Sequence, residues 1–338
     1  MRVVLTAVLA IGLMGTAMAA DTPPAPAAKK ILFGIQTGQQ DTTYAALVDI
    51  WKEAEALGFD SAWNFDHLAP IRGDVNGPCL EGWTLLSALA AHTSKLRIGT
   101  LVTGNTYRNP ALLAKMATTV DIISNGRLEL GIGAAWFEPE HQAYGFPFYT
   151  AKERADRLGE SLEVITKLWT ADHPSFAGKY YTLKNAPFNP PPVQKPHPPI
   201  VIGGKGKKWI MPLVAKYGDG WNVPIGVSPQ GIKNRLQIIH DECKRIGRMP
   251  CDPEVSAFLV LYSISDVPLA GPVTKLGARM VAGKGVSRSI LTGTAQAITE
   301  QIREYVDAGA THIIVHIEPP YDKELLRRFA REVIPNFR

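Results

Sequence analysis

The stretch GRLELGIGAAWFEPEH at residues 126–141 decides the fold of this chain. Its apolar residues at 128–132 form a strand pattern that ends in a glycine pair, Gly131 and Gly133, followed by two alanines. Two aromatic rings, two carboxylates and an imidazole come next. Small residues allow a ligand to approach the backbone closely, so the stretch predicts a strand that ends at a binding site. A tight strand-to-helix turn with a solvated loop is the alternative interpretation.

The same construction recurs along the chain, because short apolar strand patterns alternate with amphipathic helical patterns. The eight strands are predicted at residues 31–36, 61–65, 96–102, 128–132, 199–202, 220–223, 255–263 and 312–317. The first turn, at residues 36–40, lacks the glycine fingerprint of an open dinucleotide-binding sheet. We therefore predict an α/β fold, an eight-stranded (β/α)8 TIM barrel whose active site lies in the loops that follow the strands.

Two insertions interrupt this alternation. The first follows the fourth strand at residues 171–198 and contains a predicted hairpin around residues 178–181. The second follows the seventh strand at residues 265–291 and is long and irregular. Long loops of this kind are commonly functional, so the second insertion is expected to form a lid over the pocket.

The N-terminus has the features of a targeting segment. Arg2 precedes an apolar run at residues 3–14, and Ala17 and Ala19 occupy the positions that a signal peptidase reads. The run is too short for a comfortable membrane span, and no twin arginine is present. We predict a Sec-type signal peptide at 1–19, a Pro/Ala-rich linker at 20–30 and the barrel domain at 31–338. The protein is expected to be exported, periplasmic or secreted, with no stable membrane span after cleavage.

Charge and cysteine content narrow the possible partners. The 338 residues include 36 Lys and Arg against 31 Asp and Glu, a formal net charge of +5, and the basic residues are scattered. This pattern argues against nucleic acid and favours an anionic small ligand. Among Cys79, Cys243 and Cys251, one disulfide is possible in an oxidising compartment, and the last two are the nearer pair. No cluster of residues has metal-ligand spacing, so no metal site is expected.

Polar residues stand at the ends of the second and third strands. Asp66 and His67 place an acid and a base side by side, and Thr103 and Asn105 follow the third strand with a glycine between them. His67 is a candidate for proton transfer or cofactor contact because barrel active sites form at strand ends. Hydrogen bonding within the loop is the structural alternative for this histidine.

The fifth strand runs into IGGKGKK at residues 202–208. Gly203, Gly204 and Gly206 allow backbone N–H groups to point at an anion, Lys205 adds charge, and the following helix adds its dipole. The segment predicts a phosphate site, with a plain flexible turn as the alternative. No serine-centred elbow is present, so we expect the chemistry to come from an organic cofactor that carries phosphate.

The loop after the fourth strand allows two interpretations of its aromatic pair. Trp136 and Phe137 are either core residues or a lid over a flat ring, whereas Glu138 and His141 are expected to lie in an exposed loop without a functional role.

These segments resemble the luciferase-like family of flavin- and deazaflavin-dependent oxidoreductases over residues 31–317. The motifs that carry the resemblance are LGFDSAW at 57–63 leading to Asp66-His67, LRIGT at 96–100, RNP at 108–110, SNGRLELGIG at 124–133, WFEPE at 136–140, PIVIGG at 199–204, YGDGWN at 217–222 and REYVDAGA at 303–310. The WFEPE loop looks most like the branch of the family that uses coenzyme F-420.

The resemblance implies a barrel that binds coenzyme F-420 or FMN at the carboxyl ends of its strands. Carried onto this chain, the phosphate-holding residues are Gly203, Gly204, Lys205 and Gly206, and the residues that line the ring are Thr103, Asn105, Gly133 and Ala134. The resemblance also implies a non-prolyl cis peptide near Leu101–Val102 and a role for His67 in proton transfer or substrate contact. One departure stands out: some deazaflavin dehydrogenases have a catalytic glutamate just after the fourth-strand glycines, where this chain has Trp136.

The sequence therefore predicts an oxidoreductase that uses F-420 or FMN for hydride transfer to or from a small organic substrate, with His67 and Asp66 as the catalytic candidates. A flavin or deazaflavin reductase is a further expected partner, and a homodimer is the expected assembly. Two alternatives remain open. One is an FMN-dependent monooxygenase that activates oxygen, and the other, favoured by the export signal, is a non-catalytic binding protein for an anionic ligand.

Overall fold

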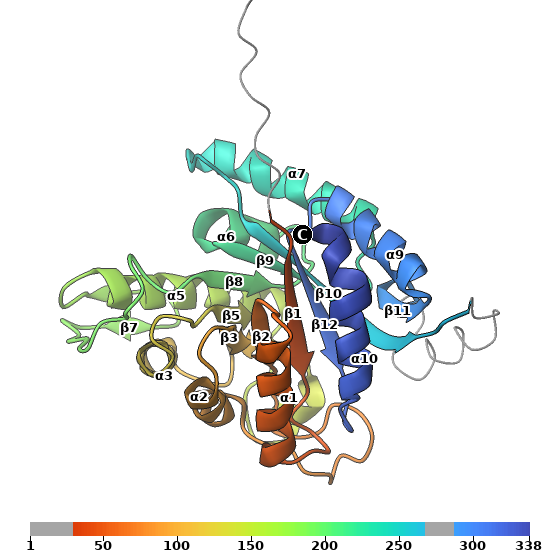
Figure 1. The fold of residues 1–338 in the computed structure, drawn as a ribbon. Coiled ribbons are helices and arrows are strands. Elements are labelled where there is room, and N and C mark those ends of the chain that lie inside the picture. Colours follow the sequence, from red (N-terminus) through yellow and green to blue (C-terminus); the bar gives the residue numbers. More distant parts are fainter. Residues whose placement is uncertain (1–29, 268–286) are drawn as a thin grey trace, which may run out of the picture.

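A parallel barrel wrapped by helices forms the computed structural model, which describes residues 30–267 and 287–338 (Figure 1). The barrel strands are β1 (Leu32–Thr37), β2 (Ser61–Asn64), β3 (Arg97–Thr100), β4 (Thr103–Gly104), β5 (Leu130–Gly133), β8 (Ile200–Gly203), β9 (Gly220–Val223), β10 (Glu254–Ile264), β11 (Ile290–Gly293) and β12 (His312–Ile317). The predicted signal peptide and all but the last residue of the linker lie outside the described residues.

The sheet closes on itself. Its hydrogen-bonded order is β3-β2-β1-β12-β10-β9-β8-β5-β4, and β3 and β4 are successive parts of one chain segment. A parallel bridge between Ile98 and Leu128 joins β3 to the segment that enters β5. The predicted eight-stranded barrel is confirmed, with β3 and β4 together forming its third strand.

The barrel strands are largely buried because both of their faces are covered, as is usual for parallel sheets. Trp63, Leu101, Val201 and Ile314 pack together as one buried cluster. A larger apolar core lies between the strands and the surrounding helices.

Helices surround the sheet and mostly alternate with its strands along the chain, as the sequence predicts (Figure 1). They are α1 (Tyr44–Ala56), α2 (Gly82–His92), α3 (Pro110–Ile123), α4 (Glu138–Ala143), α5 (Ala151–Thr170), α6 (Ile210–Tyr217), α7 (Pro229–Ile246), α9 (Ala295–Asp307) and α10 (Lys323–Arg328). Helix α7 shows why such bounds are predictable: the Ser228 side chain accepts the N–H of Gly231, and the helix ends at Gly247 with φ of 72°.

Two elements differ from the prediction. Helix α4 replaces the expected loop after the fourth strand. Strand β11 begins within the last residues of the second insertion and pairs with the end of β10, because β10 extends beyond its pairing with β12 at Val260. Residues 268–286 of that insertion lie outside the described part of the chain. The predicted hairpin of the first insertion is present as β6 (Phe176–Ala177) and β7 (Thr182–Leu183).

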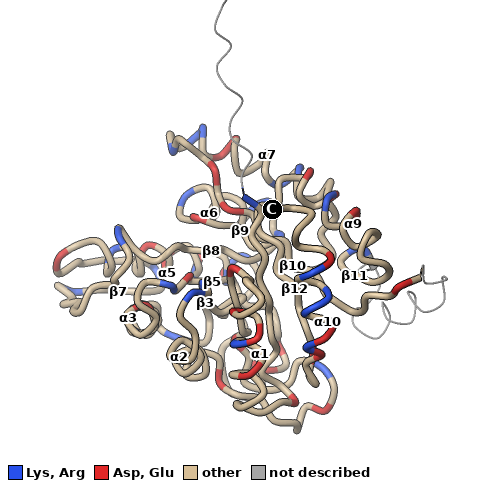
Figure 2. Tube along the Cα trace, in the orientation of Figure 1, with Lys and Arg blue, Asp and Glu red and all other residues tan. Residues whose placement is uncertain are grey.

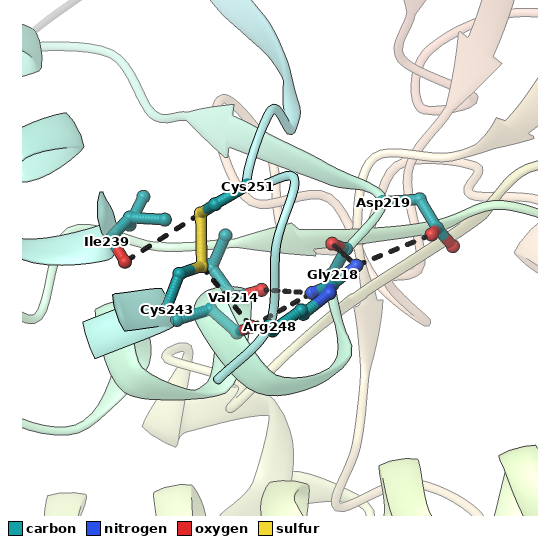
Figure 3. Close-up of a disulfide and its surroundings, with 8 residues drawn as sticks. Val214, Gly218, Asp219, Ile239, Cys243, Arg248 and Cys251 are labelled. Atoms are coloured by element: carbon teal, nitrogen blue, oxygen red, sulfur yellow. Dashed lines mark hydrogen bonds and ion pairs between the residues drawn. A yellow bond between two sulfur atoms is a disulfide. The ribbon is translucent and has the colours of Figure 1, made fainter. Parts of the chain in front are cut away.

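Cys243 and Cys251 form a disulfide between the end of α7 and the segment before β10 (Figure 3). Between them, Arg248 donates to the main-chain carbonyls of Val214 and Gly218, at 3.3 and 2.9 Å, where α6 ends. Cys79 is a free thiol. The nearer pair of cysteines is therefore the one that the structure joins.

Charged residues of both signs are interspersed over the outer helices (Figure 2). On α10 and α1, for example, Lys323 pairs with Asp49 and Arg327 with Glu53. In the described ranges, none of the helices combines the length and the apolar character that a membrane crossing requires.

Candidate active site

The chain is kinked between β3 and β4, at a cis peptide between Leu101 and Val102, where the family resemblance implied one. The Val102 side chain lies against the glycine-rich ends of β5 and β8. A Cβ placed on Gly133 would lie 2.9 Å from Val102 Cγ2, and one on Gly203 would lie 2.8 Å from the same atom. Glycine is therefore required at both positions, and the predicted cofactor residues on β4, β5 and β8 stand side by side.

Thr103 and Asn105 differ in how their side chains are used. Thr103 Oγ1 lies 2.6 Å from Thr100 Oγ1 and accepts the indole N–H of Trp83 at 2.9 Å, so structural bonds occupy it. The Asn105 main chain donates to the Gly133 carbonyl at 3.0 Å, but its side-chain Nδ2 is buried and has no acceptor among the described residues. A buried amide donor without a partner fits a ligand that brings an acceptor oxygen.

The predicted phosphate loop follows β8 directly. Gly204 has φ of 134°, its carbonyl accepts the indole N–H of Trp221 at 2.8 Å, and the Gly206 carbonyl caps the first turn of α6 at Ile210. Helix α6 begins at Ile210, after this loop. Within the described residues the main-chain N–H groups of 205–207 find no acceptor, and Lys205 is exposed. This arrangement of donors and positive charge suits a phosphate group.

Asp66 forms a two-point ion pair with Arg108, with Nη···Oδ distances of 2.7 and 2.9 Å, and accepts the Gly104 main-chain N–H at 3.1 Å. Burial lowers the pKa of Arg108, but the carboxylates of Asp66 and Glu81 raise it more, so it lies above its ordinary value. The guanidinium therefore stays charged, and Asp66 anchors the loop after β4. Its assignment as a catalytic residue stays a prediction.

His67 takes no part in that ion pair and contacts Glu140 instead. Its Nδ1 lies 3.0 Å from Glu140 Oε2, and its Nε2 has no partner in the part of the chain that the structure describes. The rings of Phe65, Trp136 and Phe137 surround the imidazole, with centroids 5.2 to 5.9 Å away. The His67 side chain keeps 10% of its surface exposed, so one nitrogen of a nearly enclosed histidine remains available to a ligand.

The two aromatic residues after β5 differ in their exposure to solvent. Trp136 is 64% exposed beside His67, as a lid residue would be, whereas Phe137 is half-buried. Glu138 is exposed, as expected. The expectation for His141 is wrong: this side chain is fully buried in α4 and hydrogen-bonds the Phe137 carbonyl and the Thr106 hydroxyl, at 2.8 and 2.7 Å.

Sequence reasoning missed the groups that hold the site together, which are Glu140, Tyr107 and Arg108. One signal was available for Glu140, because a proline in a first turn with acidic residues around it is typical of a helix start. Residues 138–140 read EPE and do begin α4. No comparable local signal marks Tyr107 or Arg108.

The fold and these strand-end groups define a barrel enzyme that binds a phosphorylated cofactor. The family model described as luciferase-like monooxygenase matches residues 29–267, and the chain belongs to this family. It is therefore a flavin- or deazaflavin-dependent oxidoreductase that acts on a small molecule.

Several relatives are similar over almost their whole length. The F420-dependent glucose-6-phosphate dehydrogenase of Amycolatopsis mediterranei (strain U-32) is 30% identical over 323 residues, covering 86% of this chain and 94% of the relative. The enzyme of the same name from Microbacterium testaceum (strain StLB037) is 28% identical, covering 90% and 97%.

Solved structures show the same fold. An F420-dependent secondary alcohol dehydrogenase, determined with an F420-acetone adduct, matches with a TM-score of 0.79 at 23% identity, covering 91% of this chain and 99% of that one. The long-chain alkane monooxygenase LadA matches with a TM-score of 0.75 at 17% identity, covering 91% of each chain.

Proposed function

We propose that this protein uses coenzyme F-420 to exchange a hydride with the alcohol or carbonyl carbon of a small organic substrate. The observation that carries the proposal is the set of unpartnered donors at the strand ends, which are Asn105 Nδ2 and the main-chain N–H groups of residues 205–207. These donors can bind the acceptor oxygens of the ring and of the phosphate of such a cofactor. The F420-dependent relatives support F-420 over FMN.

The residues at the site have different roles. Gly203, Gly204, Lys205 and Gly206 would hold the phosphate, and Asn105 would bond the ring. The bound deazaflavin supplies the site at which a hydride is accepted or donated. Phe65, Trp136 and Phe137 exclude water from His67, whose free Nε2 accepts the hydroxyl proton when an alcohol is oxidised and returns it when a carbonyl is reduced.

A cofactor titration tests this proposal. The purified protein is titrated separately with F-420 and with FMN, and bound cofactor is followed by its absorbance and fluorescence. We expect saturable uptake of F-420 and its reduction by an alcohol without consumption of oxygen. Uptake of FMN with oxygen consumption would instead support the monooxygenase. Uptake without turnover of any alcohol offered would support the binding protein, and no uptake of either cofactor would overturn the redox function.

We also propose that the protein is exported through the signal peptide at 1–19. The disulfide between Cys243 and Cys251 supports this, because such bonds persist in oxidising compartments. Mass spectrometry of the protein recovered outside the cytoplasm would show an N-terminus at Ala20. Recovery of the uncleaved chain in the cytoplasm would contradict export. To reduce a carbonyl, an exported enzyme would need a deazaflavin or flavin reductase in its own compartment to resupply the reduced cofactor, and this reductase completes the proposal.

A homodimer is the proposed assembly. Helix α3 supports it, because Leu112, Ile122 and Ile123 are 41–54% exposed on its surface. Light scattering of the purified protein measures the mass directly. We expect twice the mass of the chain, and a monomer at micromolar concentration would contradict the proposal.

A further inference from the structure

One carboxylate joins three loops at the mouth of the barrel. Glu140, in α4 after β5, accepts four hydrogen bonds. Its Oε1 accepts the main-chain N–H groups of Leu68 and Ala69, at 2.5 and 3.2 Å, from the loop after β2. Its Oε2 lies 3.0 Å from Nδ1 of His67 and also accepts the hydroxyl of Tyr107, from the loop after β4.

These contacts determine the charge of the carboxyl group. The Glu140 side chain has no exposed surface, and its four donors match the four lone-pair sites of a carboxylate. Burial raises the pKa of Glu140, but hydrogen bonds from His67 and Tyr107 outweigh it and hold the pKa below its ordinary value. Burial and the bond to Glu140 raise the pKa of Tyr107, so the phenol keeps its proton and remains a donor. Glu140 is therefore ionised and can only accept.

An acceptor-only partner fixes the tautomer of the histidine. Because Glu140 cannot donate, Nδ1 of His67 must carry the proton, and in the neutral ring Nε2 then carries the lone pair. The other groups against His67 are three aromatic rings and the thiol of Cys79, which donates to the His67 carbonyl at 3.6 Å. Burial and the nearby carboxylates raise the pKa of Cys79 to about 12, so this neighbour is neutral.

We propose that Glu140 is the positioning residue of the active site: with Tyr107, it holds His67 as the Nδ1–H tautomer and stabilises the imidazolium formed during the reaction. The inference rests on the proposed function. When an alcohol is oxidised, the C–H electron pair leaves as a hydride to the deazaflavin, the O–H proton moves to His67 Nε2, and a C=O bond forms. The Glu140 carboxylate then faces the positive imidazolium across the Nδ1–H bond. Its electrostatic stabilisation of the ring is therefore stronger after the proton has moved to Nε2 than before.

Nitrogen-15 NMR of histidine-labelled, cofactor-free protein tests the tautomer directly, and the His67→Asn variant identifies the signal. In the wild type we expect the proton on Nδ1. In Glu140→Gln the side-chain amide turns its N–H₂ group toward Nδ1, so the proton should move to Nε2. Glu138→Gln, on the exposed side of the same helix, is the matched control and should keep the wild-type spectrum.

Two results would overturn the proposal: a wild-type proton on Nε2, or a Glu140→Gln spectrum identical to the wild type. If the Glu140→Gln variant does not fold, the wild-type spectrum alone decides between the two tautomers. Tyr107→Phe provides a second measurement, because it leaves the carboxylate in place and should keep the proton on Nδ1.

Turnover separates this inference from the proposed function. In Glu140→Gln we expect kcat to fall roughly 100-fold with little change in KM, since the lost interaction is made to the imidazolium rather than to the substrate. Unchanged kcat would contradict the positioning role. A protein with the Glu140-dependent tautomer that takes up neither F-420 nor FMN would contradict the proposed function alone.

Discussion

Nε2 of His312 in β12 lies 2.8 Å from Oγ of Ser61 in β2, at the amino end of the barrel. Nδ1 of the same ring lies 2.8 Å from Oε1 of Glu254, so the three residues have the order of a hydrolase triad. The serine oxygen is fully buried, however, and accepts the indole N–H of Trp63 at 2.8 Å. This network is therefore structural, and it ties β2, β10 and β12 together at the end of the barrel opposite the active site.

Gly34 makes room for that network, so we predict that Gly34→Ala destabilises the fold. A Cβ at position 34 would lie 2.1 Å from Ser61 Oγ and 3.1 Å from His312 Nε2, both in the packed interior. The expected loss in the free energy of unfolding is roughly 2–3 kcal/mol, measured by urea denaturation. Gly159→Ala in α5 is the control, because only the flexible end of Leu213 lies near the new methyl group, and it should cost less than about 0.5 kcal/mol.

The same network predicts a loss of stability in acid. Burial raises the pKa of Glu254, but bonds from His312 and from both Nη atoms of Arg97, at 2.9 and 3.1 Å, lower it to about 2. A carboxyl with a depressed pKa stabilises the folded state above its ordinary pKa of about 4.5, and that contribution is lost as the pH falls toward 2. Urea midpoints measured from pH 6 to pH 3 should therefore fall.

Glu254→Gln should have a lower midpoint at pH 6 and a flatter dependence on pH, whereas Glu138→Gln should follow the wild type. If the urea midpoint of Glu254→Gln depends on pH as steeply as that of the wild type, other carboxyl groups cause the acid sensitivity.

The disulfide between Cys243 and Cys251 closes a short loop, because the two cysteines are 8 residues apart. Chain entropy for a loop of this size predicts that Cys243→Ser with Cys251→Ser lowers the free energy of unfolding by about 2–3 kcal/mol. A reductant should lower the melting temperature of the wild type and leave the double variant unaffected. Equal sensitivity of both proteins to the reductant would contradict this prediction.

The barrel was predictable from the sequence because most strands are short apolar runs and several helices have local end signals, as Ser228 and Gly247 show for α7. Strand β11 was not predictable, since its only pairing partner in the described part of the chain is the extension of β10. The backbone of the candidate site was predictable where glycines shape it, as at Gly203 and Gly204, whereas their role in holding phosphate stays a prediction. Pairings between loops were not, because the residues that bond His67 and Asp66 lie 73 and 42 positions further along the chain.

Lys205 provides a direct test of the phosphate loop. Its ammonium group is exposed at the end of β8, beside main-chain N–H groups that have no acceptor in residues 30–267 and 287–338. Lys205→Ala should weaken F-420 and FMN binding about tenfold and reduce the salt dependence of the affinity. Lys184→Ala removes another exposed charge, directly after β7, and should bind as the wild type does. Equal affinity in the two variants would place the phosphate elsewhere.

Replacing Asn105 should affect the stability of the fold and the affinity for cofactor in opposite directions. In the cofactor-free protein its buried Nδ2 lacks an acceptor, and a buried donor without a partner lowers the stability of the fold. Asn105→Leu removes this donor at similar volume, so the free energy of unfolding should stay equal or rise while cofactor affinity falls at least tenfold. Thr103→Val is the contrast, because it leaves the buried indole N–H of Trp83 without its acceptor and should cost roughly 1–3 kcal/mol. If Asn105→Leu binds cofactor normally, the ring does not use this amide.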